Sequence, residues 1–214
     1  MKISGELKNK LDECRSLTDT LERRLAIASI ITEAFKENQL SVPVLVGGGA
    51  VEVYTGGEYA THDTDFIADL DGLEYALMES LGYKRVLGDK NLYHKELESL
   101  VEFPKGPLAG NQERIFTYQC ESTNLPVYII SPEDLILDRI ESFYATNDGK
   151  SKEWAERLLT GMYEYLDWSY FHNESYARGI GELAEKLQRK SKGYRKAFLK
   201  MNDSIIPTKN MKMF

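Results

Sequence analysis

The chain has 214 residues, a formal net charge of −7 and 42% hydrophobic residues, which suits one globular domain or a domain with a helical appendage. No apolar run reaches the roughly 18 residues of a membrane-spanning helix, and the first residues lack the apolar segment of a signal peptide. The two cysteines lie far apart and match no metal-binding spacing. We therefore expect a cytoplasmic protein that does not enter a membrane.

The first predicted element is a helix over residues 18–38, with Thr18 as its N-cap. Its apolar residues recur at helical spacing, namely Leu21, Leu25, Ala28, Ile31 and Phe35. A buried strand over residues 42–46 comes next and runs into three consecutive glycines. A short helical pattern then leads to a second strand, which carries two aspartates.

A run of short strands follows a predicted helix over residues 72–81. The strand candidates cover residues 83–86, 91–94, 99–103, 115–120 and 127–130, and residues 104–114 form a loop rich in proline and glycine. We expect these strands to form a mixed sheet with flanking helices, in an α/β domain over residues 1–130.

The pattern changes at Ser131, which is a suitable N-cap for a helix that begins at Pro132. From there to residue 200 the chain reads as helices, with breaks expected near residues 147–149 and near Asn173. A C-terminal helical region is therefore predicted over residues 131–214, and the fold class is α+β.

The most informative stretch is VGGGAVEVYTGGEYATHDTDF, from residue 46 to residue 66. Asp63 and Asp65 alternate with Thr64 on a strand, so both side chains point to one face, with Cα atoms about 6–7 Å apart. Glycines that open a helix present backbone N–H groups to phosphate. Carboxylates together with phosphates are typical ligands of Mg²⁺. The pattern indicates a site for a metal-bound triphosphate.

A glycine pair, a spacer and an Asp-x-Asp pair make up this pattern, with Gly47 and Gly48 in the turn. It resembles the signature of the DNA polymerase β-like nucleotidyltransferase superfamily. The forms VGGxAVxxYTxG and TxDxDF, EFPKGPLAG and ISPEDLILDRIESFYATNDGKSKEWAERLL are similar to a small bacterial branch related to abortive-infection type toxins. The resemblance covers about residues 42–160 and implies a nucleotidyltransferase-like fold.

The superfamily uses a third carboxylate on a later strand, and Glu102 in SLVEF matches it, since an acid in an apolar strand is costly unless paired or metal-bound. The resemblance implies that Asp63, Asp65 and Glu102 hold two Mg²⁺ or Mn²⁺ ions and that Glu102 helps to deprotonate the acceptor. It also implies that Gly47 and Gly48 bind the phosphates of an NTP. Taken alone, an Asp-x-Asp pair also fits a solvated strand end, and the glycines fit a tight turn.

The triphosphate should also meet a cation of the protein. By resemblance to the toxins we favour Arg139 and Lys152 in the helical region, with Lys105 and Lys150 as further candidates. Each favoured residue could instead form an ion pair at helical spacing, the available acids being Asp138, Glu141 and Glu156.

The stretch from Lys186 to Lys200 holds seven basic residues and no acidic one. It fits either the solvated face of a terminal helix or a contact with RNA, since clustered basic side chains attract phosphate backbones.

The leading hypothesis is a Mg²⁺-dependent nucleotidyltransferase that moves NMP from an NTP to a hydroxyl. The acceptor classes are RNA, tRNA 3′ ends especially, protein side chains and small molecules such as aminoglycosides. By resemblance the protein could be a toxin-like component with an antitoxin or another protein partner. The alternatives are a non-catalytic module of the same fold that binds a nucleotide or a partner, and an RNA-binding protein acting through residues 186–200 alone.

Overall fold

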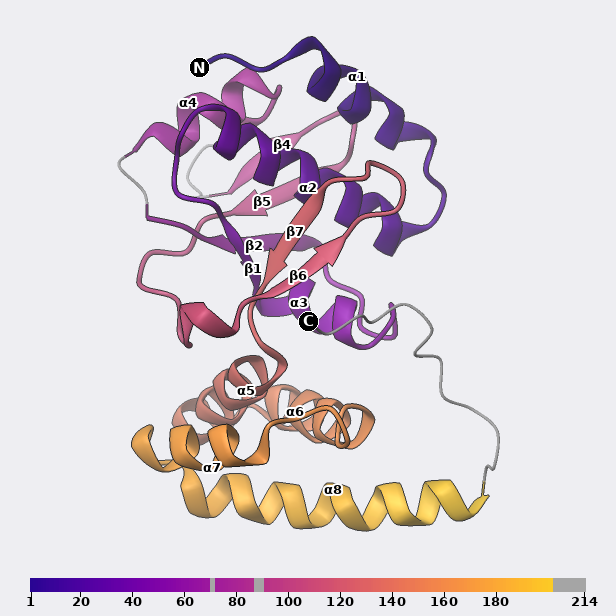
Figure 1. Ribbon diagram of the computed structural model, residues 1–214, viewed down its shortest axis with the longest axis vertical. Helices are drawn as coiled ribbons and strands as arrows, with labels where there is room; N and C mark the ends of the chain where they lie inside the picture. Colours follow the sequence, from indigo (N-terminus) through magenta and orange to yellow (C-terminus); the bar gives the residue numbers. More distant parts are fainter. Residues whose placement is uncertain (70–71, 87–90, 202–214) are drawn as a thin grey trace. The chain divides into compact units, whose positions relative to one another are not determined.

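The computed structural model describes residues 1–69, 72–86 and 91–201, with side chains up to residue 196. The chain divides into two compact units, Met1–Ser131 and Pro132–Phe214. We call them the α/β unit and the helical unit and describe each by itself. Figure 1 labels most of their elements.

The α/β unit is built on a seven-stranded sheet in the order β3-β4-β5-β2-β1-β7-β6. Two neighbouring pairs, β1 with β7 and β2 with β5, are parallel, and the other pairs are antiparallel. The predicted mixed sheet and the α+β fold are thereby confirmed. The strands are β1 (Val44–Val46), β2 (Asp63–Ile67), β3 (Lys84–Arg85), β4 (Leu92–His94), β5 (Ser99–Glu102), β6 (Phe116–Gln119) and β7 (Pro126–Ile129).

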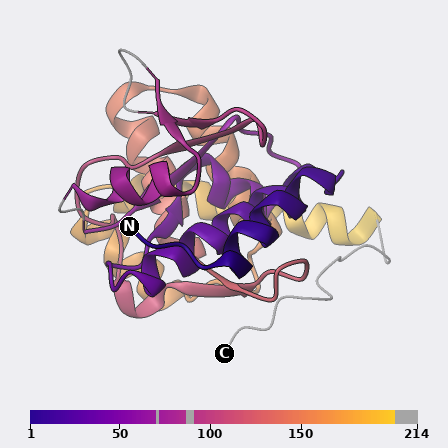
Figure 2. The same ribbon diagram turned by 90° about the horizontal axis from the view of Figure 1, so that it is seen from above.

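Helices flank this sheet, and α2 packs against β7 with its buried apolar face. Figure 2 shows α1 and α2 side by side, and the two helices are in contact. The helices of this unit are α1 (Gly5–Glu13), α2 (Thr20–Glu37), α3 (Gly47–Tyr54) and α4 (Leu73–Ser80), with 3₁₀ turns at Cys14–Ser16 and Gln112–Arg114.

Two helices of this unit differ from the prediction. Asp19, and not Thr18, caps α2, because its carboxylate accepts the backbone N–H of Glu22 at 2.7 Å. Helix α1 was not predicted at all. It buries only Leu7 and Leu11, and two apolar residues are too few to make helical periodicity visible in so polar a segment.

The helical unit consists of α5 (Pro132–Thr146), α6 (Gly149–Gly161), α7 (Trp168–Ala177) and α8 (Gly181–Met201). The predicted break at residues 147–149 is confirmed, whereas the break near Asn173 is wrong, because Asn173 is an exposed residue inside α7. The chain instead turns before Asp167, which caps α7, and again at Gly179, whose φ is +73°. None of the helices in the described ranges is both long and apolar enough to cross a bilayer.

Candidate active site

Gly47 stands where β1 ends and α3 begins, and this position requires glycine for two reasons. Its φ of +60° lies in the left-handed region that a side chain disfavours. A Cβ atom added to it would lie 2.3 Å from Oδ2 of Asp65. Without a Cβ atom, Gly47 lets the Asp65 carboxylate lie directly against the backbone at the start of α3.

The register of the sheet brings the three predicted carboxylates to one face. Asp65 of β2 is paired directly with Glu102 of β5 and with Val46, the last residue of β1. Asp63 and Asp65 are partly exposed, while Thr64 between them is buried. Paired residues on neighbouring strands share a face of the sheet, so Glu102 lies beside Asp65 on the side that also carries Asp63.

These carboxylates fit a magnesium ion that arrives with its nucleotide. Within residues 1–69, 72–86 and 91–201, no three His, Cys, Asp or Glu side chains form a complete metal-ligand cluster. Mg²⁺, however, usually takes one or two carboxylates and completes its octahedron with water and substrate phosphates. Hard oxygen donors on one face of the sheet suit that mode of binding.

Thr61 links the second glycine of the turn to the first aspartate. Its hydroxyl donates to Oδ1 of Asp63 at 2.6 Å. A Cβ added to Gly48 would lie 2.9 Å from the same hydroxyl, so the absence of a side chain at Gly48 lets α3 approach Thr61 closely.

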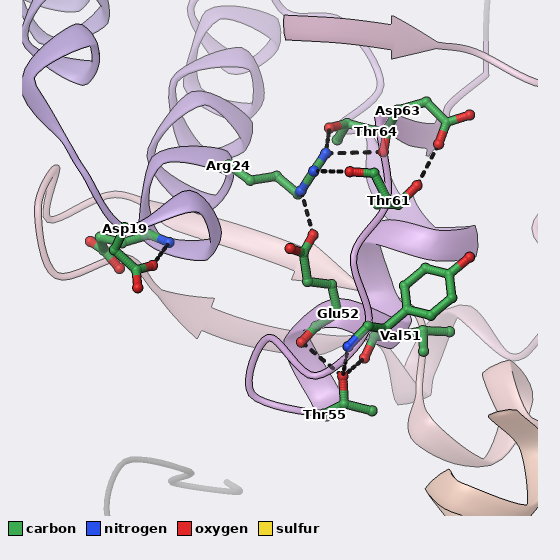
Figure 3. Close-up of polar contacts among 10 residues, drawn as sticks. Asp19, Arg24, Val51, Glu52, Thr55, Thr61, Asp63 and Thr64 are labelled. Carbon is green, nitrogen blue, oxygen red and sulfur yellow. Dashed lines mark hydrogen bonds and ion pairs between the residues drawn. The ribbon is translucent and has the colours of Figure 1, made fainter.

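Arg24 and Glu52 also belong to the site, although the sequence reading did not select them (Figure 3). Nε of Arg24, on α2, lies 2.6 Å from Oε2 of Glu52, on α3. The other guanidinium nitrogens donate to the backbone oxygens of Thr61 and Asp63 and to the hydroxyl of Thr64. The sequence did contain a signal for Arg24. It lies four residues before Ala28, so it places a charge next to the apolar stripe of its helix.

The basic residues predicted for the triphosphate lie in both units. Lys105 follows β5 in the α/β unit and its side chain is exposed. Arg139 on α5 lies 3.7 Å from Asp138, and its Nε has no hydrogen-bond partner among the residues that the structure describes. Lys152 on α6 lies 5.1 Å from the ring centre of Phe143, and Lys150 is exposed beside it.

Of the three acids that could have neutralised the favoured residues, Asp138 pairs with Arg139, whereas the other two have other partners. Glu141 binds Arg178 at 3.2 Å and Glu156 binds Lys190 at 2.7 Å. The nucleotide-binding roles of Arg139 and Lys152 stay predictions.

The basic stretch from Lys186 to Lys200 forms much of α8, and part of its charge is already paired. Arg189 binds Glu185, Lys190 binds Glu156 and Arg195 binds Glu164. Lys186, Lys192 and Lys196 are exposed, whereas the side chain of Lys200 lies outside the described residues. Some cations of the stretch are therefore paired within the fold and others face solvent, and the contact with RNA stays a prediction.

Solved structures of low sequence identity resemble the chain over most of its length. An antigenic nucleotidyltransferase-like protein from Paracoccidioides brasiliensis has 15% identity and a TM-score of 0.46, covering 69% of this chain and 76% of that one. The antibiotic-resistance factor ANT(2'')-Ia in solution has 18% identity and a TM-score of 0.42, covering 82% and 92%. ANT(2")-Ia in complex with adenylyl-2"-tobramycin has 20% identity and a TM-score of 0.42, covering 82% and 98%.

No curated protein matches the chain, and the resemblance to the toxin branch stays a prediction. The model of a family described as nucleotidyltransferase of unknown function (DUF6036), in contrast, matches residues 22–190. The matched range includes the glycine turn, all three carboxylates, and both Arg139 and Lys152. The chain therefore belongs to this family of nucleotidyltransferases.

Proposed function

We propose that this nucleotidyltransferase depends on Mg²⁺ and moves NMP from an NTP to a hydroxyl group, with RNA as the favoured acceptor. The observation that carries the proposal is the β2–β5 register, in which Glu102 lies beside Asp65 on the face of Asp63. Gly47 supports it, because the missing Cβ atom lets the Asp65 carboxylate lie against the backbone of the glycine turn.

In this proposal Asp63, Asp65 and Glu102 hold the divalent ions, and the backbone N–H groups of Gly47 and Gly48 bind phosphate at the start of α3. The chemistry supplied by the bound ions is neutralisation of phosphate charge and a lowered pKa of the acceptor hydroxyl. The acceptor oxygen forms a bond to the α-phosphorus while the bond to the β-phosphate oxygen breaks and pyrophosphate leaves. Glu102 takes the hydroxyl proton.

A cation of the protein should bind the triphosphate in addition, and Arg139 is our first choice. A guanidinium binds phosphate oxygens in bidentate fashion, and the Nε of Arg139 lacks a hydrogen-bond partner among the described residues. Lys152 is the second choice, and its Nζ lies 5.1 Å from the ring centre of Phe143. Replacing either residue should raise the KM for NTP more than it lowers kcat.

Exposed groups on α8 favour RNA over protein or a small molecule as the acceptor. Lys186, Lys192 and Lys196 are exposed there, and Tyr194 is 54% exposed. Lysines neutralise a phosphate backbone, and an exposed aromatic ring stacks on bases. Binding of RNA should therefore weaken steeply as the salt concentration rises.

The proposal is tested by transfer of label from each α-labelled NTP, with Mg²⁺, to total RNA, to total protein and to a panel of aminoglycosides. Wild type is compared with the Asp63→Ala/Asp65→Ala variant. Asp69→Ala is the matched control, because Asp69 is an exposed acid just beyond the other end of β2. We expect labelled RNA from wild type and from the control, and none from the double variant.

Label on protein or on an aminoglycoside would support the proposed nucleotidyl transfer but would show that RNA is not the acceptor. No label with folded protein, together with thermal stabilisation by NTP in the absence of Mg²⁺, would instead support a non-catalytic nucleotide-binding module. Growth arrest on expression of wild type, relieved by Asp63→Ala, would add the toxin-like role that the sequence resemblance implies.

A further inference from the structure

Arg24 is a mostly buried cation whose contacts all lead to the segments that carry the candidate site. Its side chain is 15% exposed and that of its partner Glu52 is 4% exposed. Nη2 donates to the backbone oxygen of Thr61 at 2.6 Å, and Nη1 donates to that of Asp63 at 3.0 Å. Nη1 also donates to the hydroxyl of Thr64 at 2.9 Å.

These contacts lie at the start of β2, beyond the last residue of β2 that pairs with β1. The β1–β2 ladder ends with the pairing of Val46 and Asp65, because the chain turns into α3 at Gly47. The oxygens that Arg24 binds belong to residues further towards the N-terminus of β2. The guanidinium thus supplies donors to a stretch of backbone that β1 does not reach.

Glu52 connects the same guanidinium to the glycine turn. It lies in α3, the helix that begins at Gly47, and its carboxylate is buried next to Nε of Arg24. Figure 3 shows Arg24 reaching from α2 to both segments, with the Asp63 carboxylate on the far side of the strand. One side chain therefore joins α3, which carries the glycines, to the start of β2, which carries the aspartates.

We propose that Arg24, oriented by Glu52, is a positioning residue that fixes the Asp63 carboxylate relative to the glycine turn. The connection runs from Nη2 of Arg24 to the backbone of Thr61 and from the Thr61 hydroxyl to Oδ1 of Asp63. Arg24 touches no reacting atom in this arrangement. Its importance for catalysis depends on the function proposed above, whereas its hold on the backbone does not.

The chemistry of arginine explains why this position should not tolerate lysine. Three nitrogens of a planar, permanently charged group point here to α3 on one side and to β2 on the other. A lysine keeps the charge but presents its donors from a single atom. Arg24→Lys can therefore retain an ion pair with Glu52, but it cannot also reach both backbone oxygens.

The test compares Arg24→Lys with Arg23→Lys, a matched control at the adjacent, partly exposed residue of α2. Hydrogen exchange of the free protein, followed by mass spectrometry, reports on the backbone without any substrate. We expect peptides that cover residues 47–54 and 59–65 to exchange about tenfold faster in Arg24→Lys only, with β6 and β7 unchanged.

The second readout is the rate of nucleotidyl transfer by the same variants. With NTP, Mg²⁺ and the acceptor, kcat of Arg24→Lys should fall about ten- to a hundredfold while its KM for NTP stays within about threefold.

Glu52→Gln is the second variant, because it keeps the shape of the side chain and removes only the charge that orients Arg24. It should accelerate exchange in the same two segments, by less than Arg24→Lys does.

Two outcomes would show that Arg24 is a purely structural residue and would overturn the proposal. One is exchange that rises equally across the α/β unit, and the other is a lower melting temperature with an unchanged kcat. A wild type that labels no acceptor would refute the proposed function alone, since the exchange pattern would still decide the role of Arg24.

Discussion

Each unit of this protein contains a buried pair between an arginine and a carboxylate, and the two pairs are alike in geometry. Arg24 and Glu52 in the α/β unit approach to 2.6 Å with side chains 15% and 4% exposed. Arg178 and Asp134 in the helical unit approach to 2.7 Å with side chains 13% and 1% exposed. Burial and distance alone would assign the same role to both.

The pairs differ in what else each guanidinium contacts. Arg178 also forms ion pairs with Glu141 and Glu174, so it connects side chains of α5 and α7. Arg24 instead donates to the backbone of Thr61 and Asp63. A guanidinium bound to side chains holds helices together, whereas one bound to backbone oxygens determines the path of a strand. The role of each arginine is therefore indicated by the other acceptors that its guanidinium contacts, and not by the buried ion pair itself.

The largest effect on stability is expected from Arg178→Ala. It leaves the Asp134 carboxylate buried without its cation, which typically costs about 3–5 kcal/mol. Urea denaturation followed by circular dichroism should show the loss, with nucleotidyl transfer retained at temperatures where the variant is folded. If transfer fell as much as it does in Arg24→Lys, the division of roles would be wrong.

Joint replacement of the other pair should separate stability from activity. In Arg24→Met/Glu52→Leu no charge remains buried, so the free energy of unfolding should change less than in Arg178→Ala. Transfer should still fall at least about tenfold, because the backbone oxygens of Thr61 and Asp63 lose their donor. Denaturation and initial rates measured on one preparation decide this. Full activity in the double variant would remove the positioning role.

A smaller loss of stability is expected from Tyr170→Phe. The Tyr170 hydroxyl donates to Asp134 at 2.9 and 3.1 Å, and a hydrogen bond to a charged group contributes about 1.5–3 kcal/mol. Asp134 keeps Arg178 in this variant, so the change should lie at the lower end of that range. A change as large as that of Arg178→Ala would mean that the hydroxyl, and not the cation, holds Asp134.

Acid should weaken the α/β unit through His94 of β4. Burial lowers the pKa of His94 from its ordinary value of 6.5, although the neighbouring Glu96 opposes the shift. Nδ1 of the neutral ring accepts the backbone N–H of Leu97 at 3.3 Å, and protonation would remove that acceptor.

Since the folded state binds this proton more weakly than the unfolded state, stability should rise with pH up to about 6.5 and fall as the pH drops below it. His94→Asn should flatten the dependence of the urea midpoint on pH in that window. An unchanged slope in the variant would assign the acid sensitivity to other groups.

The smallest effect is expected at an exposed pair in the helical unit. Arg157 and Glu153 lie 2.9 Å apart with side chains 52% and 55% exposed. Arg157→Ala should change the free energy of unfolding by about 0.5 kcal/mol or less. This variant is the control for Arg178→Ala, and a loss of several kcal/mol in both would show that burial does not govern the difference.

The parts of the fold that depend on local sequence were predictable. The strands lie within one or two residues of their predicted ends, because alternation and turn residues act over a few positions. Asp63 and Asp65 were placed on one face for the same reason. Glu102 was selected because the resemblance to the superfamily implies a third carboxylate, and an acid in an apolar strand is costly unless paired or metal-bound. The glycine turn was visible as a run of three identical residues.

The rest depends on contacts between distant segments. Arg24 and Glu52 lie 28 residues apart, and each one alone reads as a misplaced charge on an apolar helix. Their meaning appears only when α2, α3 and β2 are brought together. A helix break was predicted near Asn173, yet α7 accommodates this residue on an exposed face, where its weak helix propensity costs little.

The pairing of Asp65 with Glu102 has a consequence for molecules that fold with β5 in the wrong register. If β5 slid by one residue along β2, Glu102 would turn into the core and Val101, now fully buried, would turn to the other face. A molecule with that error would lack its third acid and would also expose apolar surface of the kind that chaperones and proteases recognise. Removal of molecules with this misfolded strand would therefore also remove molecules whose candidate active site is incomplete.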